Sequence, residues 1–123
     1  MIKRVLIVDD SRLARMAVIK GLSKLRPGWT YSEASNPDEA IAAMNASPAD
    51  LAIIDFNMPI RDGLTLAGEL LELAPTLPIA LLSANAQQEI LDRTAQLGAI
   101  FLTKPLNETA FSAFLDSASG QVR

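Results

Sequence analysis

The stretch Leu51-Ala52-Ile53-Ile54-Asp55-Phe56-Asn57-Met58-Pro59-Ile60-Arg61-Asp62-Gly63 decides the fold. Its first four residues are apolar without alternation, which is typical of a strand buried on both faces of a sheet. An acidic residue, Asp55, follows directly. Pro59 is expected to stiffen the loop and Gly63 to supply a positive φ before a segment of helical period begins. The stretch therefore predicts one strand-loop-helix unit of an α/β fold.

Four further short runs divide the chain, at 5–8, 30–34, 79–82 and 99–102. The run at 30–34 is the most polar, which favours an edge position in the sheet. Helical periods separate the runs, for example Ala14, Ala17, Val18, Gly21, Leu22 and Leu25, and later Ile90, Leu91, Ala95 and Leu97. Five strands alternating with five helices predict an α/β, doubly wound, five-stranded parallel sheet of the flavodoxin-like kind.

Capping residues predict the ends of several helices. Asn36 is a candidate cap with Pro37 in the first turn, and Glu39 completes the pattern of a capping box. Gly98 is placed to end the fourth helix, and Asn107 can cap the fifth. We expect residues 1–123 to form one domain, with 117–123 as a frayed tail.

Composition excludes many kinds of chemistry. The 123 residues include no histidine and no cysteine, so histidine-based triads, thiol catalysis and the common zinc sites are impossible within the chain. The net charge of −3 offers no electrostatic footprint for nucleic acid, so no nucleic-acid partner is expected. The apolar run at 5–8 is too short for a signal peptide or membrane span, which predicts a cytoplasmic protein without a membrane partner.

Polar residues follow the predicted strands: Asp9, Asp10, Asp55, Ser83, Thr103 and Lys104. The carboxyl ends of parallel strands share one edge of the sheet, where ligands of such folds bind. Each close pair of carboxylates there costs about 4 kcal/mol at an effective dielectric near 20, and Lys104 supplies one positive charge only. A hard divalent cation such as Mg²⁺ would offset the repulsion, and a phosphoryl group would complete its ligands.

These residues in this order resemble the signature of response-regulator receiver domains. The matching pieces are Asp9-Asp10, the stretch from Asp55 to Gly63, Ser83-Ala84 and Thr103-Lys104-Pro105. The resemblance covers essentially the whole chain. It implies a stand-alone response regulator, similar to the chemotaxis response regulator, that takes a phosphoryl group from a histidine kinase or histidine phosphotransfer protein.

The resemblance also implies a role for each residue. Asp55 would be the phosphoacceptor, and Mg²⁺ would be bound by Asp10 directly, by Asp9 through water, by Asp55 and by the main-chain carbonyl of Asn57. Asn57 and Asn85 occupy positions that tune loss of the phosphoryl group, and two neutral amides there predict self-dephosphorylation within minutes. The plainer reading is that both are loop residues, and that Asp9-Asp10 is a solvated turn.

Three further residues belong to the implied switch. Ser83 and Lys104 would bind phosphoryl oxygens, Phe101 would be the rotating aromatic, and Lys104-Pro105 would be a cis peptide. The signal would reach a separate target protein through the surface of the fourth helix, fifth strand and fifth helix. Alternatively, Ser83 caps a helix and Phe101 is simply core.

The first helix is the expected kinase contact. Leu13, Met16 and Ile19 lie off its core stripe beside Arg12 and Arg15, although scattered exposed apolar residues are normal. A monomer is expected, with a weak dimer as the alternative. The chain is expected not to be an enzyme beyond its own phosphorylation and dephosphorylation. Two rival functions are an interaction module that works unphosphorylated and a small Mg²⁺-dependent hydrolase of the haloacid dehalogenase kind. The second normally carries an aspartate where this chain has Asn57.

Overall fold

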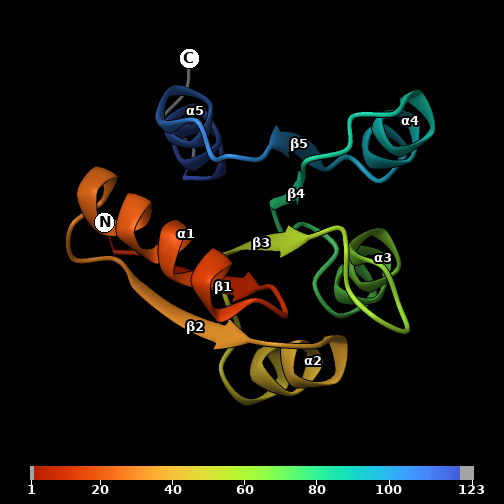
Figure 1. The fold of residues 1–123 in the computed structure, drawn as a ribbon. Coiled ribbons are helices and arrows are strands. Elements are labelled where there is room, and N and C mark those ends of the chain that lie inside the picture. Colours follow the sequence, from red (N-terminus) through yellow and green to blue (C-terminus); the bar gives the residue numbers. More distant parts are fainter. Residues whose placement is uncertain (1, 120–123) are drawn as a thin grey trace.

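The computed structural model describes residues 2–119, in which five strands alternate with five helices (Figure 1). The strands are β1 (Arg4–Val8), β2 (Thr30–Ala34), β3 (Leu51–Asp55), β4 (Ile79–Ser83) and β5 (Ile100–Thr103). The helices are α1 (Arg12–Leu25), α2 (Pro37–Ala46), α3 (Gly63–Leu73), α4 (Gln88–Gln96) and α5 (Glu108–Ala118). The predicted α/β alternation is confirmed.

All strand pairs are parallel, and the order across the sheet is β2-β1-β3-β4-β5. The polar strand β2 lies at an edge, as its composition predicts. The strand order reverses between β1 and β3, so the carboxyl ends of these two strands flank the crevice where doubly wound folds bind ligands.

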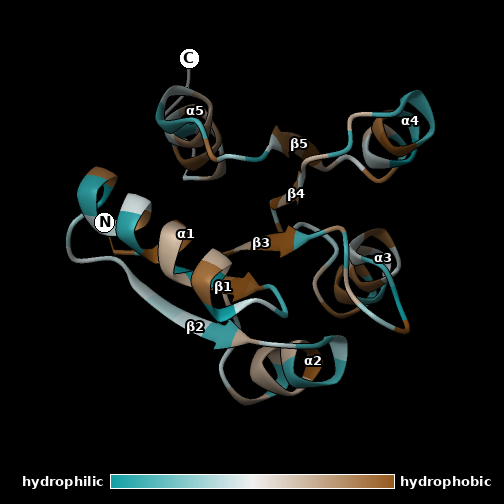
Figure 2. Ribbon diagram, viewed as in Figure 1, coloured by the Kyte–Doolittle hydropathy of each residue, from teal (hydrophilic) through white to brown (hydrophobic). Residues whose placement is uncertain are grey.

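The helices cover both faces of the sheet (Figure 1). One face packs against α1 and α5 through residues such as Val18, Leu22, Phe111 and Leu115. The other face packs against α2, α3 and α4, and β3 and β4 are fully buried between the layers. Figure 2 shows β1, β3 and β5 in the brown of apolar residues, whereas β2 is pale to teal and the helices carry both colours. Residues of β1 and β3 belong to the cores on both faces, so packing on either side holds these two strands in place.

Helix capping follows the sequence with one difference. The side chains of Asn36 and Asn107 accept from the amides of Glu39 and Ala110, at 2.8 and 2.9 Å. The Glu39 carboxylate, however, accepts from the amide and hydroxyl of Ser35, one residue before the predicted partner. These bonds, the amide first, hold the pKa of Glu39 below its ordinary value. Gly98 has φ 76° just beyond α4, which confirms its predicted place at the end of that helix.

One predicted boundary and one predicted core position are wrong. α5 continues to Ala118, so residues 117 and 118 are helical and not a frayed tail, whereas residues 120–123 lie outside the described residues. In α4 the buried residues are Ile90 and Thr94, not Ala95, because the Thr94 hydroxyl donates to the Ile90 carbonyl at 2.6 Å and so can be buried. Across residues 2–119, every helix is too short or too polar to cross a membrane.

Candidate phosphorylation site

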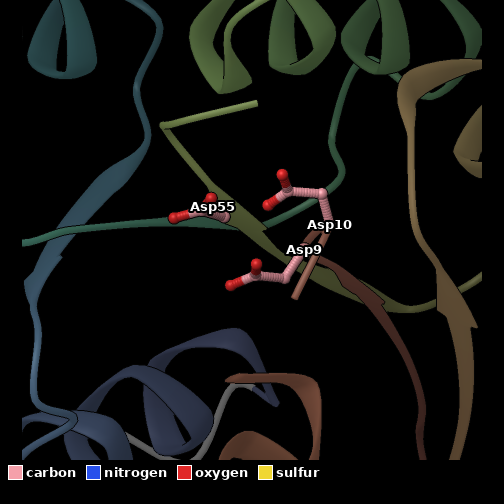
Figure 3. Close-up of side chains that lie close together, drawn as sticks. All are labelled: Asp9, Asp10 and Asp55. Atoms are coloured by element: carbon pink, nitrogen blue, oxygen red, sulfur yellow. The ribbon is translucent and has the colours of Figure 1, made fainter. Parts of the chain in front are cut away.

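Sheet register brings the three predicted carboxylates together. Val8 in β1 pairs with Ile54 in β3, so Asp9 and Asp10 emerge beside Asp55, the last residue of β3. One carboxylate oxygen from each aspartate lies within 4.8 Å of the others (Figure 3). Asp9 and Asp55 are buried and Asp10 is exposed. The predicted acidic cluster is therefore present at the carboxyl edge of the sheet.

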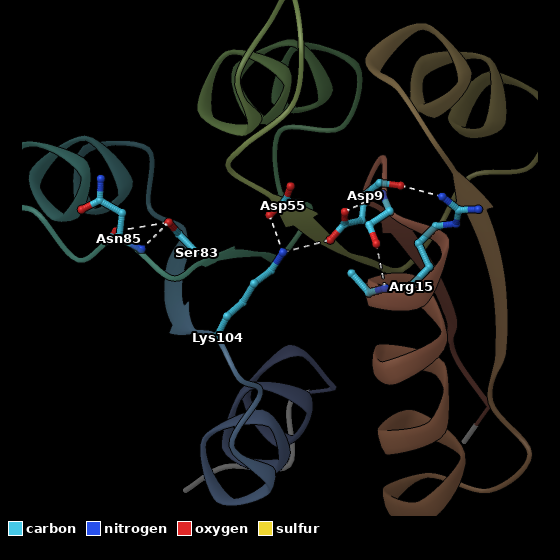
Figure 4. A network of polar contacts seen from close by, with 8 residues as sticks. Asp9, Arg15, Asp55, Ser83, Asn85 and Lys104 are labelled. Atoms are coloured by element: carbon cyan, nitrogen blue, oxygen red, sulfur yellow. Dashed lines mark hydrogen bonds and ion pairs between the residues drawn. The ribbon is translucent and has the colours of Figure 1, made fainter.

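Lys104 reaches into the cluster from the end of β5. Its Nζ atom lies 2.7 Å from Oδ1 of Asp55 and 3.1 Å from Oδ2 of Asp9 (Figure 4). Its amide donates to the carbonyl of Ser83 at 3.1 Å, which ties the loop after β5 to the end of β4. The Lys104-Pro105 peptide is cis, as predicted.

Burial and charge shift two pKa values at the site. Removal from water raises the pKa of Asp55 above its ordinary value, and the charges of Asp9 and Asp10 act in the same direction, whereas the Lys104 ammonium opposes them. Burial acts to lower the pKa of Lys104, but its hydrogen bonds to Asp55 and Asp9 prevail and raise it. The ammonium is therefore firmly charged, whereas the ionised form of Asp55 is destabilised.

The sequence interpretation missed what holds Asp9 in place. Its side chain accepts from the amide of Ser11 at 2.9 Å, and its main-chain carbonyl accepts from the Arg15 guanidinium at 2.7 Å. Arg15 also pairs with Glu33 on β2 at 2.9 Å. The sequence places Arg15 beside an outward contact surface, but its side chain is largely buried. The sequence signal for this ion pair is the acidic residue Glu33 near the end of β2, together with the basic residues in the first turn of α1.

The loop after Asp55 is anchored at both ends. Met58 is buried, and the amide of Gly63 donates to the Phe56 carbonyl at 2.9 Å. A Cβ on Gly63 would lie 2.3 Å from the main-chain oxygen of Asp55. The expectation of a positive φ at Gly63 is wrong, since the residues with positive φ among those described are Gly28, Gly98 and Ile60. Glycine is required at 63 because the start of α3 approaches the main chain at the end of β3 closely.

Ser83 is buried at the edge of the cluster, with its hydroxyl turned to its own loop. The hydroxyl accepts from the amide of Asn85 at 3.0 Å and lies 3.2 Å from the Asn85 carbonyl (Figure 4). The Asn85 side chain in turn accepts from the amide of Gln87 at 3.1 Å. The structure therefore places Ser83 near Asp55 without a hydrogen bond between the two. It caps a turn ahead of α4 and not the helix itself.

The remaining predicted residues are placed as follows. Phe101 is half-buried and packs against the cluster of Leu64, Leu81 and Ile90, between α3 and α4. Asn57 is exposed in the loop after β3. Leu13 and Met16 are exposed at 79% and 51%, as expected of a contact surface. Ile19 instead packs against the core, so its assignment to that surface is wrong.

The site fits a hard divalent cation. Its available donors are carboxylate oxygens, which are the ligands that Mg²⁺ prefers, and three of them can approach one point. Two of the three carboxylates are buried, and the described residues place one ammonium among them. A divalent cation would therefore offset repulsion that Lys104 leaves uncompensated.

Comparison with known proteins identifies the class. The family model described as the response regulator receiver domain matches residues 5–116, so the chain belongs to that family. The chain is 34% identical over 107 residues to the transcriptional regulatory protein PdtaR of Mycobacterium tuberculosis, covering 85% of this chain and 51% of PdtaR. It is 33% identical over 103 residues to protein-glutamate methylesterase/protein-glutamine glutaminase 3 of Geobacter sulfurreducens, covering 83% of this chain and 28% of that protein. The chain thus spans about half or less of these relatives.

A solved structure has the same fold over nearly the whole length of both chains. The chemotaxis protein CheY4 of Vibrio cholerae superposes with a TM-score of 0.85 at 26% identity, covering 96% of this chain and 99% of that one. The prediction of a receiver fold is confirmed by this match and by the strand order.

Proposed function

We propose that the chain accepts a phosphoryl group on Asp55 from a phosphohistidine of a histidine kinase or histidine phosphotransfer protein. The observation that carries the proposal is the joint placement of Asp55, two further carboxylates and Lys104 at the carboxyl edge of the sheet. An Asp55 carboxylate oxygen would attack phosphorus, forming an O–P bond while the N–P bond breaks. The electron pair of that bond stays on the imidazole nitrogen of the donor, which takes up a proton.

Asp9, Asp10, Asp55 and the main-chain carbonyl of Asn57 would hold Mg²⁺. The cation would supply charge neutralisation and a template for the phosphoryl oxygens. Lys104, already 2.7 Å from Asp55, would transfer its contact from the carboxylate to a phosphoryl oxygen. Phosphoryl transfer asks a protein chiefly for positioning and charge stabilisation, and these side chains are suited to both.

Phosphorylation would then bias a two-state equilibrium. The Ser83 hydroxyl would leave its turn with Asn85 to bind a phosphoryl oxygen, and Phe101 would move inward beside it. Ser83 ends β4 ahead of α4, and Phe101 lies within β5, so the α4–β5–α5 surface would change its affinity for a target protein. The exposed Leu13 and Met16 on α1 would contact the kinase.

Intact mass spectrometry tests the proposal. We expect the protein to gain one phosphoryl group when incubated with Mg²⁺ and a small acyl phosphate, and to lose it again. The gain should be absent without Mg²⁺ and in Asp55→Asn. No adduct on the wild-type protein, together with failure to bind beryllofluoride, would instead favour an interaction module that works unphosphorylated. Turnover of phosphate esters would favour a hydrolase.

A further inference from the structure

Ile60 combines complete exposure with an unfavourable backbone conformation. Its side chain is 100% exposed, and among residues 2–119 it is the one residue other than glycine with positive φ, at 75°. A β-branched side chain rarely adopts that region, because its Cβ is crowded by the backbone. Full exposure to water and a positive φ both disfavour isoleucine at position 60. Neither solubility nor folding stability therefore explains why isoleucine is found there.

The backbone at Ile60 forms a tight three-residue turn. The Arg61 amide donates to the Pro59 carbonyl at 2.8 Å, across Ile60. A hydrogen bond of this span with φ near +75° is typical of the γ-turn that is rare and strained. Strained turns of this kind persist where the surrounding structure fixes them, and they gather at functional sites.

Arg61 fixes the turn between two helices. Its guanidinium pairs with Asp38 in the first turn of α2 at 3.2 Å and with Glu69 of α3 at 3.0 Å. Met58 anchors the other side of the turn in the core. The loop therefore presents Ile60 in one orientation, so that binding through it loses little conformational entropy.

The position of the loop identifies what could contact it. Ile60 follows Asp55 by five residues. It lines a groove of about 390 Å³ together with Pro37 and Pro59 and with four polar residues, Asn36, Asp38, Glu39 and Arg61. The loop runs directly from Asp55, the last residue of β3, to the start of α3, so a protein that brings a phosphohistidine to Asp55 approaches this loop. The Arg61 charge beside Ile60 is already paired with Asp38 and Glu69, so the contact offered there is apolar.

We propose that Ile60 is an apolar anchor for the protein that delivers the phosphoryl group, and that this partner presents an apolar surface beside its phosphohistidine. The inference rests on the proposed function and adds to it a second contact, separate in sequence from α1. A fully exposed residue that becomes buried in the partner can contribute strongly to binding, since such anchors dominate interface energetics.

The test compares Ile60→Asn with Leu73→Asn. Asparagine tolerates positive φ, so Ile60→Asn should leave the thermal unfolding midpoint equal to or above that of the wild type. Leu73, half-exposed at the far end of α3 from the site, is the matched control. Two phosphodonors are used: a small acyl phosphate and a purified histidine kinase, taken from a panel as the one that phosphorylates the wild-type chain fastest.

We expect kcat/KM with the kinase to fall about tenfold in Ile60→Asn, mainly through KM, while the acyl phosphate reaction and the control keep wild-type rates. Kinase rates within twofold of wild type in Ile60→Asn would overturn the inference. Equal losses with both donors would also overturn it, because they indicate a distorted site. If the wild-type chain accepts phosphate from the acyl phosphate but from no kinase, this inference fails, whereas Asp55 as the phosphoacceptor stands. If it accepts from neither donor, the proposed function fails as well.

Discussion

The Nζ atom of Lys104 lies 2.7 Å from Oδ1 of Asp55, at the point where β3 and β5 end. The same ammonium contacts Asp9 at 3.1 Å, so one cation serves two buried carboxylates. The third carboxylate, of Asp10, makes no ion pair within residues 2–119. The site is therefore short of positive charge, and its stability should depend on what neutralises it.

Lys104→Met should destabilise the metal-free protein by about 1–2 kcal/mol at neutral pH, because Asp9 and Asp55 then lose their shared cation. This loss lies between that of an exposed ion pair and that of a buried one, because the two carboxylates are buried whereas Lys104 is partly exposed. Urea unfolding with a chelator measures the loss. Excess Mg²⁺ should recover part of it, whereas Lys24→Met, which breaks an exposed pair with Glu108, should change little. Equal stability of Lys104→Met and wild type would contradict this picture.

Asp55→Asn should change how stability depends on pH. Burial first, and the nearby carboxylates, raise the folded-state pKa of Asp55 above the unfolded value near 3.8. The folded state then binds the proton more tightly, so the contribution of Asp55 is fully present below pH 3.8 and is lost as pH rises through the raised pKa.

The free energy of unfolding of Asp55→Asn, relative to wild type, should therefore rise from pH 3.5 to neutral pH in chelator and then level off. Denaturant titrations at a series of pH values measure it. A difference between the two proteins that stays constant across this range, or that falls, would show that the pKa of Asp55 is not raised.

Two glycines of α3 offer a matched pair. Gly63→Ala places a Cβ 2.3 Å from the main-chain oxygen of Asp55, so the start of α3 must shift, at a cost of about 1–3 kcal/mol or more. Gly68 lies in the same helix with nothing within 4 Å of its Cβ position, and Gly68→Ala should stabilise by about 0.5–1 kcal/mol. Thermal unfolding compares the two variants. The same sign for both would mean that close approach at Gly63 does not limit the substitution.

The fold was predictable because its signals are local. Apolar runs without alternation at 51–54 and 79–82 became the fully buried strands β3 and β4, and the polar run at 30–34 became an edge. The acidic cluster was also predictable, since parallel strands bring their carboxyl ends to one edge. Residues directly after a strand were therefore the ones to examine.

The rest depended on contacts between distant residues. Arg15 looked like a free surface charge, but it is fixed by Glu33 and the Asp9 carbonyl across the β1–β2 pair. The need for glycine at 63 comes from the approach of α3 to β3, and the strain at Ile60 comes from a turn held by Arg61. None of these has a periodicity or a motif of its own, so sequence patterns could not reveal them.

Met16→Asp should slow phosphoryl transfer from a histidine kinase about tenfold while leaving the acyl phosphate reaction unchanged, because Met16 is exposed on α1 and away from the core. Rapid-quench assays with both donors measure the two rates. Ile19→Asp is the contrasting variant: Ile19 packs against the core, so its loss should lower stability and slow both reactions. If Met16→Asp also lost both activities, Met16 would be structural and not a kinase contact.

Asn85→Ala should lengthen the half-life of the phosphorylated protein, which we expect to be on the scale of minutes. The Asn85 side-chain oxygen accepts from the Gln87 amide, and its main chain holds the Ser83 hydroxyl. When Ser83 turns to a phosphoryl oxygen, its bonds to the Asn85 main chain must open, and the side-chain amide of Asn85 would then orient a water beside Asp55. Phosphate release after removal of the donor gives the rate. A wild-type half-life of hours, or an unchanged rate in Asn85→Ala, would leave Asn85 as a loop residue that only shapes the turn before α4.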